Sequence, residues 1–116
     1  MPVRHVRELP LEPVAAGHAA SRQVLLAPEE TPHFAMRRFV MAPGGSMPLH
    51  TNTVEHEQYV LRGRARVRIG DATHQVEAGS VLLIPAGTPH DYQVQGDEPF
   101  EFLCLVPNRP DEITLL

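Results

Sequence analysis

Proline and glycine recur along the whole chain, and their spread constrains the fold more than any other feature of the sequence. The 116 residues include 12 prolines and 8 glycines, and both residue types interrupt helices. No window keeps apolar residues at the i, i+3, i+4 and i+7 spacing of an amphipathic helix. Short runs rich in Val, Leu, Ile, Phe and Tyr lie between the interruptions, which is typical of β-strands. The predicted strands are residues 22–27, 34–41, 56–61, 65–69, 73–77, 81–84, 90–95 and 100–106.

Clusters of Pro, Gly and Asp separate these runs, and each cluster predicts a chain reversal. They are Pro43-Gly44-Gly45, Gly70-Asp71, Ala78-Gly79, Pro85-Ala86-Gly87 and Gly96-Asp97. Short strands at intervals of about ten residues, joined by such turns, are typical of a sandwich or barrel. We therefore predict one all-β domain over residues 1–116, with a barrel over 34–107 and an N-terminal arm or edge strands over 1–33.

Alternation within the runs predicts which side chains face the core. Every second residue over 64–69 is arginine, which predicts a solvated face on one side of that strand and a buried face on the other. In the last run, Phe100, Phe102 and Cys104 share one face and are expected to point inward. Glu101, on the opposite face, is expected to point to water.

Charge and composition narrow the classes of partner. The formal net charge is -4 and no dense basic cluster is present, so nucleic acid is not expected as a partner. No run approaches the roughly 20 apolar residues of a membrane span, and the N-terminus lacks the apolar stretch of a signal peptide. We therefore expect no membrane association and a cytoplasmic location. The single cysteine, Cys104, excludes an internal disulfide and a CxxC zinc site.

Seven histidines are unusual in a chain of 116 residues, and three of them occupy related positions. His50 follows a Pro/Gly loop, His56 opens a predicted strand, and His90 follows a second Pro/Gly turn. Imidazoles at the ends of separate strands can converge inside a small barrel, where they suit Mn, Fe, Ni, Cu or Zn. Spacing alone leaves open that they are surface or capped core residues. The remaining histidines are expected at the surface: His5, His18, His33 and His74.

The stretch from Gly44 to Gly63 resembles the first motif of the cupin superfamily, usually written G-x5-H-x-H-x3-4-E-x6-G. His50 stands at the position of the first histidine and His56 at that of the glutamate. Asn52 stands where the second histidine is usual. The resemblance therefore matches the spacing of the motif but departs from it in chemistry at two positions.

The second cupin motif, G-x5-P-x-G-x2-H-x3-N, is matched by Gly79, Pro85, Gly87 and His90, with Val94 in place of the asparagine. The resemblance covers roughly residues 34–107 and implies a single-domain cupin, a double-stranded β-helix or jelly-roll barrel. More narrowly, the chain is similar to small cupins in which histidine replaces the glutamate. Members of that group bind manganese or another divalent metal through four histidines, and some show dioxygen-dependent chemistry.

By this resemblance His50, His56 and His90 are expected to bind a divalent transition metal, with manganese favoured and iron, nickel, copper and zinc as alternatives. Three interpretations of Asn52 stay open. Its Oδ1 atom is a weak fourth ligand, or its side chain orients a metal-bound water, or the site is weakened and only partly loaded. A set of three histidines leaves up to three positions of an octahedral ion open for substrate and O2.

A small, mostly apolar substrate pocket with one cation is expected beside the metal. Its predicted lining is Arg37, Met47, Gln58, Tyr92, Phe102 and Cys104. Arg37 is chosen by correspondence with the four-histidine cupins, and Cys104 is more often a small buried hydrophobe than a catalytic thiol. Such a cavity suits a small aromatic compound, an enolisable ketone or an anionic metabolite.

The leading hypothesis is a metal-dependent oxidoreductase of the dioxygenase type, acting on a small organic substrate with O2 as the candidate co-substrate. A metal-assisted isomerase or lyase is the first alternative, and a non-catalytic module that binds small molecules is the second. No catalytic residue can be assigned from the sequence. The apolar segments 24–26 and 103–106 also predict a homodimer, with an N-terminal strand paired to the sheet of the partner.

Overall fold

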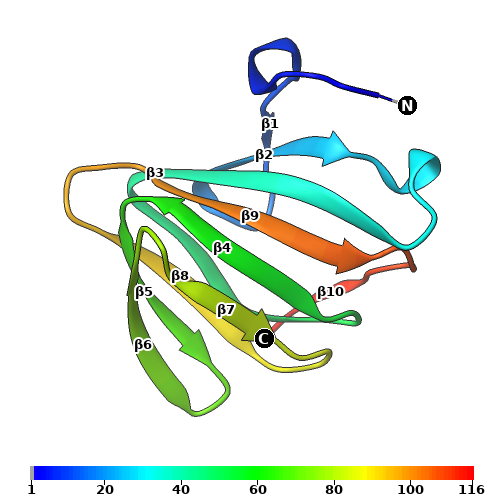
Figure 1. The fold of residues 1–116 in the computed structure, drawn as a ribbon. Helices are drawn as coiled ribbons and strands as arrows, with labels where there is room; N and C mark the ends of the chain where they lie inside the picture. Colours follow the sequence, from blue (N-terminus) through cyan, green and yellow to red (C-terminus); the bar gives the residue numbers. More distant parts are fainter. Residues whose placement is uncertain (1) are drawn as a thin grey trace.

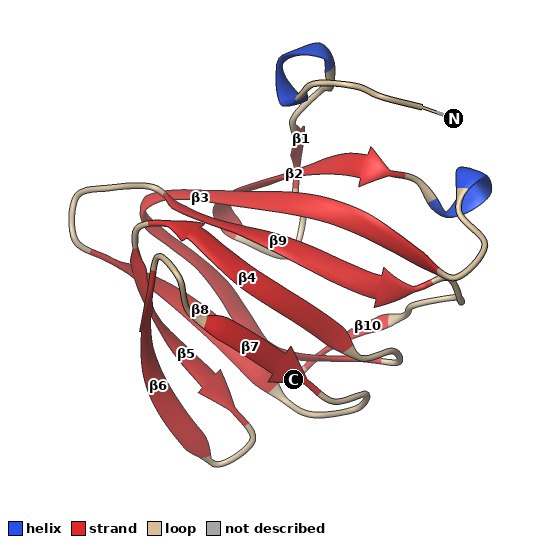
Figure 2. Ribbon diagram, in the orientation of Figure 1, coloured by secondary structure: helices blue, strands red, loops and turns tan. Residues whose placement is uncertain are grey.

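Ten strands form one continuously hydrogen-bonded sheet in the computed structural model, which describes residues 2–116 (Figure 1). The strands are β1 (Glu12–Pro13), β2 (His18–Leu26), β3 (Phe34–Asn52), β4 (His56–Arg62), β5 (Arg64–Ile69), β6 (Ala72–Glu77), β7 (Val81–Ile84), β8 (His90–Gln95), β9 (Phe100–Pro107) and β10 (Ile113–Leu115). Two short 3-10 helices, η1 (Val6–Glu8) and η2 (Pro28–Glu30), lie in the N-terminal part of the chain (Figure 2). The predicted all-β barrel fold is confirmed.

The strand order along the sheet is β6-β5-β8-β3-β9-β4-β7, with β2 and β10 also paired to β3. Apart from β6 and β5, neighbours in this order are not consecutive in the sequence, so the strands wrap across one another and the sheet curls into a barrel-like shell (Figure 1). Every pairing is antiparallel. This topology brings the starts of β4 and β8 close to the end of β3.

The predicted chain reversal at Pro43-Gly44-Gly45 is wrong, because β3 runs through it for 19 residues without a break. The first part of β3 pairs with β9 as far as Met41, and the second part pairs with β8 from Ser46 onward. The Pro-Gly-Gly segment is therefore a bend between two parts of the shell. Gly44 has a φ of 81°, and a Cβ on Gly45 would lie 2.7 Å from the carbonyl oxygen of Ala42.

Side-chain alternation mostly places the core as predicted. Ala65 and Val67 are fully buried between exposed arginines, and Phe100, Phe102 and Cys104 all point inward. Glu101 departs from its prediction.

Glu101 is 9% exposed instead of facing water. Its carboxylate pairs with Arg38 of β3 and with Arg62 of β4, 3.8 Å away. β9 lies between β3 and β4, so long arginine side chains on both neighbours cover the carboxylate. The alternation of side chains along β9 does not reveal that arginines of neighbouring strands cover Glu101.

The N-terminal arm is tied to its own chain. β1 pairs with β2, and the Gln23 side-chain amide donates to the carbonyl oxygens of Val6 and Leu9 at 2.9 and 3.1 Å. Arg4 forms an ion pair with Glu30 at 2.6 Å. No helix in the described part of the chain is long and apolar enough to span a membrane.

Candidate functional site

The structure brings the three motif histidines together from three strands. His50 lies near the end of β3 opposite His90, the first residue of β8, and His56 is the first residue of β4. The ring centroids of His50 and His90 are 4.1 Å apart, and those of His56 and His90 are 6.1 Å apart. All three side chains are buried. The histidines therefore form one cluster and are not scattered over the surface.

Backbone carbonyls orient two of these imidazoles. His50 Nδ1 lies 2.7 Å from the Pro48 oxygen, and His90 Nδ1 lies 2.9 Å from the Thr88 oxygen. Each Nδ1 therefore carries the proton and donates it, which leaves Nε2 with a free lone pair. Burial lowers the pKa of both rings, that of His90 to about 4. Both imidazoles are neutral near pH 7, the form that binds metal ions.

His56 has a carboxylate partner from the C-terminal segment. Its Nε2 atom lies 3.2 Å from Oδ2 of Asp111, and Asn52 Nδ2 donates to the same oxygen at 3.3 Å. Burial alone would lower the pKa of His56, but hydrogen bonds with Asp111 and Cys104 outweigh it and raise the pKa to about 9. Burial alone would raise the pKa of Asp111, and the same contact with His56 holds it below its ordinary value.

The chemistry of this donor set fits a divalent transition metal. Three imidazoles are donors that such ions accept, with His56 joining once the proton on its Nε2 atom is released. The Asn52 Oδ1 atom is buried without a hydrogen-bond partner among residues 2–116, so an acceptor at this cluster is left unused. As the side chains stand, no three His, Cys, Asp or Glu residues in the described chain surround a point as an ion requires. His56 Nε2 contacts Asp111 instead.

A cavity of about 440 Å³ opens beside the histidines. Five of the six predicted pocket residues line it: Arg37, Met47, Gln58, Tyr92 and Phe102. The aromatic rings form a stack, with the Phe102 ring 5.1 Å from that of Phe39 and 5.4 Å from that of Tyr92, both nearly parallel. The walls therefore favour a small and flat organic molecule.

Cys104 is the predicted pocket residue that does not line the cavity. It is fully buried behind the wall, where Arg37 Nη2 donates to its sulfur at 3.3 Å and Gln58 Nε2 approaches at 3.7 Å. Burial alone would raise the pKa of this thiol, but the hydrogen bond from His56 and the charge of Arg37 lower it. Tyr92 donates to Gln58 Oε1 at 2.9 Å, so a chain of polar contacts runs behind the pocket.

Asp111 and Arg22 also line the cavity, and sequence reasoning missed both. Asp111 lies outside the motifs and reaches the site because β10, which follows it, pairs with the end of β3. Arg22 faces Phe39 in the pairing of β2 with β3. Neither position has a local signal, because each depends on a pairing between distant strands.

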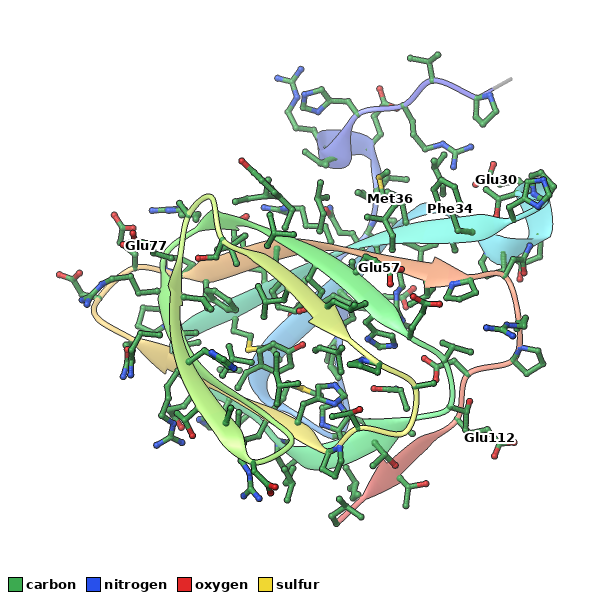
Figure 3. All side chains as sticks on the ribbon, turned by 60° about the horizontal axis from the view of Figure 1, so that its bottom comes forward. Glu30, Phe34, Met36, Glu57, Glu77 and Glu112 are labelled. Carbon is green, nitrogen blue, oxygen red and sulfur yellow. The ribbon has the colours of Figure 1, made fainter. Side chains whose placement is uncertain are left out.

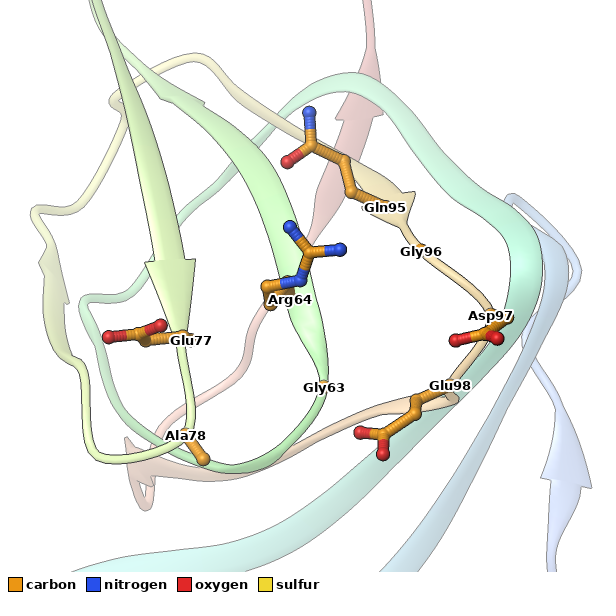
Figure 4. A pocket seen from close by; sticks show the side chains of 8 residues that line it. All are labelled: Gly63, Arg64, Glu77, Ala78, Gln95, Gly96, Asp97 and Glu98. Atoms are coloured by element: carbon orange, nitrogen blue, oxygen red, sulfur yellow. The ribbon is translucent and has the colours of Figure 1, made fainter.

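A second hollow, of about 420 Å³, lies where β4 leads into β5 and β8 leads into β9, away from the histidines. Its wall carries Arg64 with Glu77, Asp97 and Glu98 (Figure 4). Figure 4 shows the Arg64 side chain turned toward Gln95 and Gly96, whereas Glu77 points away. These charged residues are exposed, and none belongs to the histidine cluster.

Comparison with known proteins agrees with this geometry. Residues 37–106 match the family model of the cupin domain. The polyketide cyclase RemF from Streptomyces resistomycificus superposes with a TM-score of 0.88 at 28% identity, covering 100% of this chain and 87% of that one. A cupin-2 domain protein from Rhodospirillum rubrum superposes with a TM-score of 0.84 at 27% identity, covering 100% of this chain and 80% of that one.

A curated relative, the 1-methylthio-D-xylulose 5-phosphate methylsulfurylase of Rhodospirillum rubrum, is 30% identical over 77 residues. The match covers 66% of this chain and 49% of the relative. The chain thus spans about half the length of the curated relatives that it matches. The names of the polyketide cyclase and of the methylsulfurylase indicate different activities.

Proposed function

The chain belongs to the cupin family, and from that premise we propose that it is an enzyme acting on a small carbonyl compound in the histidine-lined cavity. His50, His56 and His90 would hold a divalent metal ion there. The reaction that the site supports best is proton transfer next to the carbonyl, as in an isomerase, lyase or cyclase. The fold alone does not select this reaction.

One observation carries the proposal: three buried imidazoles and one carboxylate meet at the wall of a cavity that three aromatic rings also line. Among the described residues that line the cavity, Asp111 is the one carboxylate. Its Oδ1 atom accepts from the Thr53 backbone N–H at 3.1 Å, which holds the group in place. Oδ2 faces the histidines, where a reacting molecule would lie.

The residues of the chain then have separate roles. The stacked rings of Phe39, Phe102 and Tyr92 hold a flat substrate and exclude water. Once Oδ2 is released from its contact with His56, Asp111 would accept a proton from the carbon next to the carbonyl and return it at another position. A divalent ion bound to the three imidazoles would polarise the carbonyl oxygen. Tyr92 donates a hydrogen bond to Gln58. Because burial raises the pKa of its hydroxyl, Tyr92 stays protonated and forms part of the cavity wall instead of acting as a base.

The named activities of the relatives support this choice. A polyketide cyclase and a methylsulfurylase are among the similar proteins, and cyclisation of a polyketide is carbonyl chemistry. The first of these matches the whole of this chain at 28% identity. The pocket therefore has relatives whose names indicate reactions other than oxygenation.

A dioxygenase is the second candidate, and the histidine cluster is the observation that favours it. Three imidazoles leave further positions of a six-coordinate ion open, which suits a substrate and O2 together. Manganese is the metal expected for the site, with iron, nickel, copper and zinc as alternatives. Elemental analysis of the untagged protein identifies the ion that it carries.

The experiment uses the full chain loaded with Mn²⁺ and two probes, acetophenone and pyruvate, in D2O. Nuclear magnetic resonance follows deuterium entry at the methyl group, and an oxygen electrode follows O2. We expect deuterium exchange above the buffer rate with no O2 uptake. Uptake of O2 in proportion to probe loss would support the dioxygenase instead. Metal-loaded protein that does neither would contradict both enzymes and favour a module that only binds small molecules.

A further inference from the structure

Arg37 is a cation in the cavity wall without an acidic partner. The ion pairs within residues 2–116 involve Arg4, Arg38, Arg62 and His56, and none includes Arg37. Its Nη2 atom donates to the Cys104 sulfur, but its Nε atom is buried with no hydrogen-bond partner in the same part of the chain. A guanidinium donor in this condition is costly to the fold unless something binds it.

The guanidinium is also held in one place. Its central carbon lies 5.1 Å from the centre of the Phe39 ring, and Phe39 stacks on Phe102 in the same wall. A contact of this kind restrains the plane of the guanidinium group. The fork of N–H donors is therefore arranged in advance and does not have to be ordered when a ligand arrives.

The surroundings of Arg37 are positive on balance. Arg22 lines the same cavity, and it forms no ion pair with any described residue. Asp111 is the acidic residue in the lining, and its carboxylate is already engaged by His56. Two guanidiniums thus face a cavity whose one carboxylate is in use, which attracts an anion.

Arg37 also lies close to the histidine cluster. Its Nη2 atom contacts the Cys104 sulfur at 3.3 Å, and Arg37 lines the same cavity of about 440 Å³ as the three histidines. A cavity of this size spans no more than the length of a small molecule. A ligand group on Arg37 therefore places the next few ligand atoms beside the imidazoles.

We propose that Arg37, assisted by Arg22, binds a carboxylate of the substrate, so that the substrates are short or aromatic oxo acids. The planar fork of a guanidinium matches the two oxygens of a carboxylate. This deepens the proposed function, because it places the carbonyl at the histidines and the acid group at Arg37. The assignment of oxo acids as substrates rests on the proposed function, whereas the binding of a carboxylate by Arg37 does not.

The test is equilibrium binding and requires no turnover. Benzoate is the probe and benzamide its neutral counterpart of nearly equal shape, titrated calorimetrically into the metal-loaded full chain. We expect benzoate to bind at least tenfold more tightly than benzamide. Arg37→Met should weaken benzoate at least tenfold and leave benzamide unchanged. Arg66→Met is the matched control, because it removes the same charge from an exposed residue of β5.

Arg37→Lys keeps the charge and removes the fork, and it covers the case in which Arg37→Met does not fold. It should give an affinity between those of the wild type and Arg37→Met. Equal binding of benzoate and benzamide would overturn the proposal, as would a benzoate affinity lost in His90→Ala but kept in Arg37→Met. Inorganic phosphate that displaces benzoate at lower concentration would overturn the choice of a carboxylate. None of these measurements uses deuterium exchange. A failure of the proposed reaction is therefore distinguishable from a failure of carboxylate binding.

Discussion

Oδ2 of Asp111 lies 3.2 Å from Nε2 of His56, although 55 positions separate the two residues in the sequence. The carboxylate is brought there by the C-terminal segment, whose strand β10 pairs with the end of β3. Asn52 donates to the same oxygen from β3 at 3.3 Å. The acidic group of the site therefore comes from outside the two histidine motifs.

Replacing this carboxylate tests its role in proton transfer. Asp111→Asn keeps the shape and removes the base, so deuterium exchange into acetophenone should fall by about 10²–10⁴-fold. Glu112→Gln is the matched control, because it neutralises the exposed neighbouring residue. The metal content of both variants should equal that of the wild type. Full exchange activity in Asp111→Asn would exclude this residue as the base.

Asn52 is expected to influence how tightly the metal is held. Asn52→His adds an imidazole at the position of the unpartnered Oδ1 atom and should tighten binding on the order of 10–100-fold. Turnover should fall at the same time, because the new ligand fills a position that substrate needs. His56→Ala should abolish binding. Competition with a chelating indicator measures the metal affinity of both variants. An unchanged affinity in Asn52→His would show that position 52 plays no part in metal binding.

Gly63 is expected to tolerate no side chain, because it lies against the backbone of Pro99. A Cβ on Gly63 would be 2.2 Å from the Pro99 oxygen, and its φ is 81°. Gly63→Ala should cost about 2–4 kcal/mol of unfolding free energy. Gly79→Ala is the control, since its φ is 94° but its surroundings are open, and about 1–2 kcal/mol is expected. Urea unfolding compares them, and equal losses would contradict the contact argument.

A homodimer stays a prediction, but β1 and β2 pair within their own chain, so we expect the interface at the exposed side of β4 and β7 and not at an N-terminal strand. Tyr59 and Leu61 are 45% and 42% exposed, and Val81 and Leu83 are 77% and 57% exposed. β7 ends the path of paired strands, so its edge can meet the same edge of a second copy about a two-fold axis.

Phe34 and Met36 project side by side from β3 in Figure 3, so apolar side chains extend beyond this patch. Leu83→Glu should convert the dimer to a monomer in analytical ultracentrifugation, whereas Arg66→Glu on exposed β5 should not. A wild-type chain that sediments only as a monomer at micromolar concentration would exclude the dimer.

The ion pair between Arg4 and Glu30 predicts a pH dependence of the N-terminal arm. The hydrogen bond from Arg4 lowers the pKa of Glu30 to about 2, from an ordinary value of 4.5. A lowered pKa means that the contact stabilises the docked arm above about pH 4.5 and is lost as the pH falls toward 2. Arg4→Gln should return the pKa toward 4.5, and Arg7→Gln should not. A carboxyl titration by nuclear magnetic resonance decides this, and no difference between the variants would contradict it.

The sequence by itself determined the local features of this protein. Alternation set the strands and the inward faces of β5 and β9, because side chains of a strand alternate whatever it pairs with. The two spaced motifs also located His50, His56 and His90, of which His56 and His90 open β4 and β8 and His50 lies near the end of β3. These features depend on neighbours within a few residues, so they are legible before folding.

Tertiary structure decided the rest, because it depends on pairings between distant segments. The Pro43-Gly44-Gly45 segment bends β3 instead of reversing it, since β9 pairs on one side of the bend and β8 on the other. Cys104 lies behind the cavity, where Arg37 and Gln58 donate to its sulfur. Asp111 contacts His56 because β10, the strand that follows Asp111, pairs with the end of β3. No local pattern encodes such contacts, because the free energy that selects them comes from packing of the whole shell.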